Sequence, residues 1–234
     1  MAETSTSRST ILWHLLAVVT VALMAATLYL TFFVAPAEEQ MGIVQKIFYL
    51  HVPSAYCMYV GFSVSAFGGL MYLAQRKDRW DRVALAGAEV GMLFCAIVLV
   101  TGPLWGRKAW GYYWVWDPRL TSTLLTGMIY TAYVGLRSFG EAGEAEKRFA
   151  SALALIGFPM LFLIKYSVQR WSGQHPVVIT GSGGGISGDM VPALACSFCA
   201  FTAFVIWLLW TRIRVERQRQ EIWALELETV MGDD

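Results

Sequence analysis

An aromatic segment between Trp105 and Arg119 contains the residue types that most directly suggest ligand binding. Six of its fifteen residues are Trp or Tyr, and it ends in Asp-Pro-Arg. Trp and Tyr also gather in belts at membrane surfaces, but a belt requires neither this density nor the Asp-Pro-Arg ending. The segment therefore predicts a flat aromatic platform for a large, planar, apolar ligand, with Arg107, Lys108 or Arg119 available to neutralise carboxylates on that ligand.

The chain has three histidines, His14, His51 and His175. His51 and His175 lie on two separate segments that could flank one ligand beside the aromatic segment, whereas His14 has no evident partner. Two imidazoles can occupy both axial positions of an iron ion whose equatorial ligands come from a porphyrin. A zinc site would need further Cys, His or carboxylate ligands that these segments scarcely offer. The pair therefore favours heme, with His51 and His175 as the metal ligands.

Two acidic residues, Asp117 and Glu89, lie within or beside apolar runs, where a carboxylate needs a structural or functional explanation. Asp117 is predicted to be a structural acceptor that orients indole N–H groups or caps the following helix. Glu89 lies about four helical turns before Trp105 inside an apolar run, where it is either functional or paired with a polar group in the bundle. No set of side chains in the sequence indicates a catalytic centre.

Six long apolar runs must position these residues. Each is close to the ~20 residues that a helix needs to cross the hydrocarbon core of a bilayer. The composition, 56% hydrophobic and 15% charged, exceeds what the core of a small soluble domain requires. The runs cover residues 11–35, 53–75, 83–105, 119–138, 149–167 and 189–211.

These runs predict an all-α, polytopic membrane protein, a bundle of six transmembrane helices in the lipid bilayer. Residues 1–211 would form the bundle, and residues 212–234 a charged, helical tail in the cytoplasm. The net charge of +1 gives no basis for a nucleic-acid partner.

The distribution of Lys and Arg predicts the orientation. Twelve of the eighteen cations lie on the side of the N-terminus, and the other six lie on the opposite side. Cytoplasmic segments of membrane proteins carry the excess of positive charge, so both the N- and C-termini are predicted to be cytoplasmic. Residues 36–52, 106–118 and 168–188 then share the outer compartment, together with both candidate ligands.

Residues 110–121, WGYYWVWDPRLT, resemble the tryptophan-rich "WWD" signature of heme-handling membrane proteins of cytochrome c maturation. The chain length, the six apolar runs, and the single histidines before the second run and between the fifth and sixth narrow the resemblance to the CcmC family. The resemblance covers essentially the whole chain. Pro118 departs from the family pattern, in which a small residue such as Ala is expected, and it stiffens the start of the fourth helix.

The resemblance implies a site for heme b, iron protoporphyrin IX, on the periplasmic side of the bacterial inner membrane. His51 and His175 would be the axial ligands. An external loop at residues 105–121, here called the WWD segment, would hold the porphyrin through Trp110, Gly111, Trp114, Trp116, Asp117 and Arg119.

The resemblance also implies partners. Proteins of this family present heme to the periplasmic heme chaperone CcmE, beside the ATPase CcmA, the membrane subunit CcmB and the small helix CcmD. ATPase activity would therefore reside in a partner, and this chain would deliver heme.

Two other functions stay open from the residues alone. A b-type membrane electron-transfer cytochrome also uses paired histidines, but usually places them within helices and often near both membrane faces. A permease subunit of an ABC transporter for another substrate would share the apolar helices and bind no heme.

Overall fold

The structure, a computed structural model, describes residues 2–139, 143–171, 175 and 186–232, and most of these are helical. Apart from an isolated bridge between Glu38 and Gly42, the described residues contain no β-structure. This confirms the predicted all-α class. The elements are α1 (Ala2–Tyr29) with its π-helical end η1 (Leu30–Val34), the 3-10 turn η2 (Ile43–Ile47), α2 (Phe48–Gln75), α3 (Asp78–Trp110), α4 (Pro118–Phe139), α5 (Glu144–Trp171), the 3-10 turn η3 (Gly188–Met190) and α6 (Val191–Gly232).

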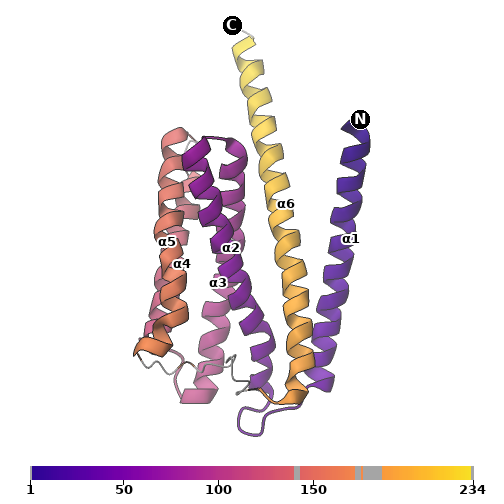
Figure 1. Cartoon of the computed structure of the whole chain (residues 1–234), viewed down its shortest axis with the longest axis vertical. Coiled ribbons are helices and arrows are strands. Elements are labelled where there is room, and N and C mark those ends of the chain that lie inside the picture. The colour runs from indigo at the N-terminus through magenta and orange to yellow at the C-terminus, as the bar shows by residue number, and fades with distance from the viewer. Residues whose placement is uncertain (1, 140–142, 172–174, 176–185, 233–234) are drawn as a thin grey trace.

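Successive helices run antiparallel, so both chain ends lie at the same end of the bundle (Figure 1). We call this the termini end. The opposite end, where α1 leads into α2 and α3 leads into α4, is the loop end; α5 finishes there and α6 begins there. The described parts of the three segments predicted to face outside therefore meet at one end of the molecule.

Five of the described helices are long and apolar enough to cross a membrane, namely α1 with η1, α2 with η2, α3, α5 and α6. Helix α4 is less apolar because Ser, Thr, Gly and Tyr interrupt its sequence. However, α3 and α5 both run toward the loop end, so the chain must return between them, and α4 provides that return. Its 22 residues give about 33 Å of helix, enough to cross the hydrocarbon core. The protein is a polytopic membrane protein.

Helices α2 and α3 pack backbone against backbone. A Cβ atom added at Gly61 would lie 2.5 Å from the backbone nitrogen of Gly91, and one added at Gly68 would lie 2.5 Å from that of Ala84. No side chain fits at such distances, so glycine permits the close approach, as it commonly does between membrane helices. The contact fixes the register of α2 against α3, and thereby the place of His51 relative to the end of α3.

Replacement of Gly68 by Ala should destabilise the bundle. The new methyl group would meet backbone atoms, which cannot rotate away, so the helices must shift, at an expected cost of about 1–3 kcal/mol. Thermal unfolding of the purified protein in detergent measures this loss. Gly135→Ala is the matched control, because a Cβ atom at Gly135 meets nothing within 4 Å; equal losses in both variants would contradict the interpretation.

Helices α4 and α5 complete a four-helix unit with α2 and α3. The Tyr130 ring of α4 stacks on Phe62 of α2 with ring centroids 3.8 Å apart, and its hydroxyl group contacts backbone carbonyls of α2 and α5. At the termini end, buried Arg137 of α4 pairs with Asp81 of α3 and Glu146 of α5, each at 2.9 Å. These contacts tie α4 to its neighbours at mid-depth and at one end.

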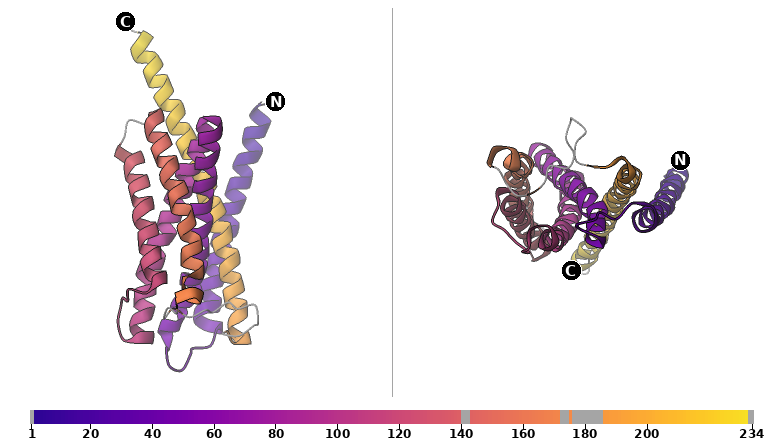
Figure 2. Two further views of the ribbon diagram at one scale, coloured as in Figure 1. Left: turned by 60° about the vertical axis from the view of Figure 1, so that its left-hand side comes forward. Right: turned by 90° about the horizontal axis from the view of Figure 1, so that it is seen from below.

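Helices α6 and α1 form the remaining side of the molecule (Figure 2). Arg212 of α6 binds Glu89 of α3 through two nitrogen–oxygen contacts of 2.6 and 2.7 Å. The acidic residue inside the third apolar run is therefore paired within the bundle. Helix α1 packs chiefly against α6. Beyond Arg212, α6 continues without interruption to Gly232 and projects past the bundle at the termini end (Figure 1).

Candidate functional site

The two candidate ligands lie next to each other at the loop end. His51 is on the first turn of α2, and His175 belongs to the connection between α5 and α6. Their ring centroids are 6.3 Å apart and their ring planes are inclined by 31°. A bond between a metal ion and an imidazole nitrogen is about 2 Å long, so two imidazoles on opposite sides of one ion have ring centres about 6 Å apart. The spacing of the pair matches that arrangement.

Thr101 of α3 orients His51. The Nδ1 atom of His51 lies 2.8 Å from the Thr101 hydroxyl oxygen, and this hydroxyl donates its hydrogen to the backbone carbonyl of Ile97 at 2.6 Å. Because that hydrogen is already used, Nδ1–H of His51 is the donor to Thr101. Nε2 of neutral His51 then carries the lone pair, as in metal-binding histidines whose other ring nitrogen donates a hydrogen bond.

Gly102 provides the space for the His51 ring. A Cβ atom at this position would lie 3.3 Å from Cε1 of His51. The turn of α3 that supplies the orienting hydroxyl therefore also leaves the imidazole room to lie against the helix.

Arg119 orients His175, whose Nδ1 atom accepts a hydrogen bond, whereas Nδ1 of His51 donates one. Its Nη1 donates to Nδ1 of His175 at 3.0 Å. Its Nε donates to the Ile164 carbonyl and its Nη2 to the Lys165 carbonyl, both on α5 and both at 3.3 Å. A guanidinium group has donors only, so Nδ1 of neutral His175 carries the lone pair and Nε2 carries the proton. The two imidazoles thus differ in which nitrogen is protonated.

The WWD segment is partly helical. Residues 105–110 belong to the end of α3 and residues 118–121 begin α4, so only residues 111–117 of the predicted loop lie outside helices. Gly111 ends α3 in a left-handed conformation with φ of 88°, and its N–H donates to the Arg107 carbonyl at 3.2 Å. Glycine is the residue that most readily adopts this conformation, which explains its presence at the turn.

Four tryptophans of the WWD segment form two edge-to-face pairs. The ring centroids of Trp105 and Trp110 are 5.6 Å apart, as are those of Trp114 and Trp116. Trp116 is 76% exposed. By contrast, Nε1 of Trp114 is buried and has no hydrogen-bond partner among the described residues. The second pair therefore combines an exposed ring with an unused buried donor.

Asp117 caps α4. Its Oδ1 accepts a hydrogen bond from the Leu120 backbone N–H at 2.7 Å, which is the usual contact of an N-cap carboxylate. This confirms its predicted role as a structural acceptor. The second carboxylate oxygen, Oδ2, is buried and has no partner in the described part of the chain. Asp117 and Trp114 thus each contribute one buried polar atom without a partner in the described part of the chain.

The structure brings part of the predicted set together. Arg119 connects the WWD segment directly with the histidine pair. The other predicted residues of the segment lie at the same end of the bundle, between the last turn of α3 and the start of α4 (Figure 1). Sequence reasoning missed Thr101, because nothing in its spacing links a threonine in the third apolar run to His51.

The chain is thus a polytopic membrane protein with a candidate ligand site, a pair of imidazoles beside a tryptophan-rich turn, at one end of its helical bundle. The chain belongs to the CcmC family, since the family model described as heme exporter protein C matches residues 2–228.

Three curated relatives illustrate the similarity. Heme exporter protein C of Bradyrhizobium diazoefficiens is 37% identical over 170 residues, which are 72% of this chain and 64% of that protein. Heme exporter protein C of Escherichia coli strain K12 is 39% identical over 145 residues, 60% of this chain and 58% of that protein. A putative cytochrome c biosynthesis ccmC-like mitochondrial protein of Marchantia polymorpha is 33% identical over 153 residues, 65% of this chain and 64% of that protein. The matches thus span less than two thirds of each relative's length.

Proposed function

We propose that this protein binds heme b at its loop end, with His51 and His175 as axial ligands, and delivers it to the periplasmic heme chaperone CcmE during maturation of c-type cytochromes. The observation that carries the proposal is the 6.3 Å separation of the two imidazole rings. The name shared by two relatives, heme exporter protein C, supports heme as the ligand.

The residues at the loop end fit this group. Heme supplies an iron ion with four equatorial nitrogen ligands, so the protein has to add only two. The Trp114 and Trp116 rings offer aromatic surface for the porphyrin, and Arg119 offers a cation for a carboxylate substituent. The unpartnered donor of Trp114 and acceptor of Asp117 are buried polar atoms that a bound molecule can satisfy.

The hydrogen bond between Arg119 and His175 has to open before His175 can bind a metal. Binding through Nε2 requires the proton to move to Nδ1, and a protonated Nδ1 cannot accept a hydrogen bond from a guanidinium group. Binding through Nδ1 requires Arg119 to leave that atom. In both cases Arg119 is released, and it becomes available to a propionate carboxylate.

The two ligands therefore have different roles. His51 is held by Thr101 with Nε2 ready for the metal, so it acts as the constant ligand. His175 would exchange Arg119 for the metal, so it is the ligand that can dissociate. Arg119 would then be free to bind a carboxylate of the heme.

The loop end would face the periplasm of a bacterial inner membrane, and the chain would assemble with CcmA, CcmB and CcmD. The excess of Lys and Arg on the side of the termini supports this orientation. Helix α6 extends past the bundle at that same end, so in this orientation its charged part, from Arg212 onward, would reach the cytoplasm, where an ATPase binds nucleotide.

Transfer of heme to CcmE tests the proposed delivery, and Trp110→Ala should impair it. The substitution removes the partner of Trp105 but leaves both histidines, so we expect an unchanged axial-ligand spectrum and about ten-fold slower transfer, as for loss of an aromatic contact residue. The measurement mixes heme-loaded full-length protein with heme-free CcmE and records absorption spectra after separation.

Trp171→Ala is the control, because this residue is 60% exposed on α5 and lies outside the WWD segment. Normal transfer by Trp110→Ala would contradict a role of the segment. An absence of transfer from the unsubstituted protein would contradict delivery to CcmE.

A further inference from the structure

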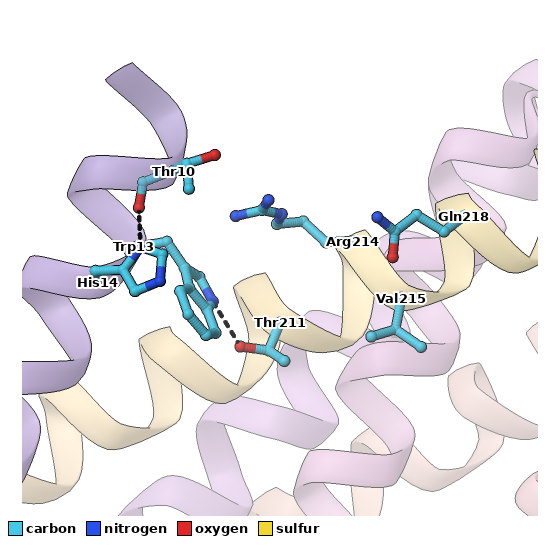
Figure 3. Close-up of a pocket in the computed structure, with 7 residues that line it drawn as sticks. All are labelled: Thr10, Trp13, His14, Thr211, Arg214, Val215 and Gln218. Atoms are coloured by element: carbon cyan, nitrogen blue, oxygen red, sulfur yellow. Dashed lines mark hydrogen bonds between the residues drawn. The ribbon is translucent and has the colours of Figure 1, made fainter. Parts of the chain in front are cut away.

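A pocket lies between α1 and α6 (Figure 3), at the termini end and thus at the opposite end of the molecule from the histidine pair. Its volume is about 210 Å³. Helix α1 contributes Trp13 and His14, and α6 contributes Thr211, Arg214 and Gln218. Figure 3 shows the Arg214 side chain reaching from α6 toward α1 across the opening.

The pocket lies at the height of lipid headgroups. His14 is 20 residues from Val34, where the helical part of the first span ends at the loop end, and Thr211 is 20 residues from Val191, where α6 begins. At about 1.5 Å per residue, both distances are about 30 Å, which is the thickness of the hydrocarbon core. Trp13 also has the residue type that prefers the boundary between hydrocarbon and headgroups.

The charge of Arg214 is not balanced by a carboxylate in the described residues. Its guanidinium group lies 5.8 Å from the centroid of the Trp13 ring. The other arginines of this part of α6, Arg212, Arg217 and Arg219, each pair with a glutamate. The pocket therefore contains a half-buried cation whose counter-ion has to come from outside the described chain.

The walls of the pocket are fixed by hydrogen bonds. Trp13 Nε1 donates to the Thr211 hydroxyl at 2.9 Å, and that hydroxyl donates to the Trp207 carbonyl at 2.7 Å. His14 lies edge-on to Trp13, with ring centroids 4.8 Å apart. Its Nδ1 atom lies 2.7 Å from the Thr10 backbone carbonyl oxygen. Because these polar groups already have partners, Arg214 and the amide of Gln218 are the donors available to a ligand.

We propose that this pocket binds the phosphodiester headgroup of an anionic phospholipid, with the phosphate against Arg214 and the glycerol region against Trp13. Basic pockets between membrane helices recognise such headgroups. The volume suits a headgroup and is below the roughly 300–1,000 Å³ of sites that enclose a whole larger ligand such as a porphyrin. The lipid would join α1, which packs chiefly against α6, to the rest of the bundle.

Native mass spectrometry of the full-length protein tests the proposal. Phosphatidylglycerol and phosphatidylcholine with the same acyl chains are added separately to the delipidated protein, and the occupancy of the first bound lipid is measured. We expect phosphatidylglycerol to bind about five- to ten-fold more tightly, as one arginine near the headgroup provides. Arg214→Gln should remove this preference, and Arg214→Lys should keep most of it.

Arg217→Gln is the matched control, because Arg217 lies one turn further along α6 and is paired with Glu221 at 2.7 Å. It should keep the preference. Equal occupancy of the two lipids in the unsubstituted protein, or an undiminished preference in Arg214→Gln, would overturn the proposal. Displacement of the lipid by millimolar inorganic phosphate would also overturn it, because it would indicate a site for free anions. Stoichiometric binding of hemin that is lost in Arg214→Gln would overturn it as well.

Discussion

Replacement of both His51 and His175 by Ala should abolish stoichiometric heme binding, and each single replacement should leave a five-coordinate heme that is retained at least about 100-fold less tightly. Substitutions that only disturb a metal-binding histidine already cost about 10–100-fold, so loss of a ligand should cost no less. Absorption spectra of the purified proteins report the change from two axial nitrogen ligands to one. Added imidazole should restore the six-coordinate spectrum in each single variant.

His14→Ala is the control, since His14 lies at the termini end, and its spectrum should match that of the unsubstituted protein. A normal heme spectrum in the double variant would refute the proposed ligands. An unsubstituted protein that binds no heme would refute heme as the ligand and would favour a permease for another substrate. A heme that is rapidly reduced by quinols would favour a b-type electron-transfer protein.

Replacement of Arg119 by Met should make His175 a stronger ligand of the iron. When His175 leaves the metal, Arg119 stabilises the free imidazole through a hydrogen bond to Nδ1 of His175. A hydrogen bond to a charged group is worth about 1.5–3 kcal/mol, more than the roughly 0–1 kcal/mol of an exposed ion pair between Arg119 and a propionate in the ligated state, so removal of Arg119 should disfavour the dissociated state by about ten-fold. Carbon monoxide, which is uncharged, competes with His175 for the reduced heme. We expect Arg119→Met to require about ten-fold more carbon monoxide for half-saturation.

Two controls isolate this effect. Lys108→Met removes an exposed cation of the WWD segment and should leave carbon monoxide binding unchanged. In a His175→Ala background, Arg119→Met should have no effect on carbon monoxide binding, because the competing ligand is absent. Unchanged or tighter carbon monoxide binding in Arg119→Met alone would contradict the exchange of partners by Arg119, and would leave the assignment of the axial ligands intact.

The helical bundle could be predicted because a membrane span imposes a length and a composition that are visible in the sequence. The ends of the helices could not, because polar residues continue a helix beyond the hydrocarbon core. The third apolar run was expected at 83–105, whereas α3 covers Asp78–Trp110. No residue interrupts that helix until Gly111, so the first six residues of the expected loop are helical.

The sequence predicts the candidate site as a set of residues but not as a set of hydrogen bonds. His51, His175 and Arg119 stood out by type and by their place between the apolar runs. Thr101 did not, because a threonine in an apolar helix ordinarily bonds only to the carbonyl four residues earlier, as Thr101 does to Ile97. Its second contact, to His51, exists only because α2 and α3 approach so closely.

The backbone contact between α2 and α3 also determines which part of the site can move. The glycines between α2 and α3 touch backbone atoms and leave these helices no room to slide past each other. His51 and Thr101 therefore keep a fixed position relative to each other. His175 is carried by a connection between two other helices and is held by a side chain. In the proposed function, mechanical work delivered by a partner would therefore open the site only from the His175 side, which would give the release of heme a fixed direction.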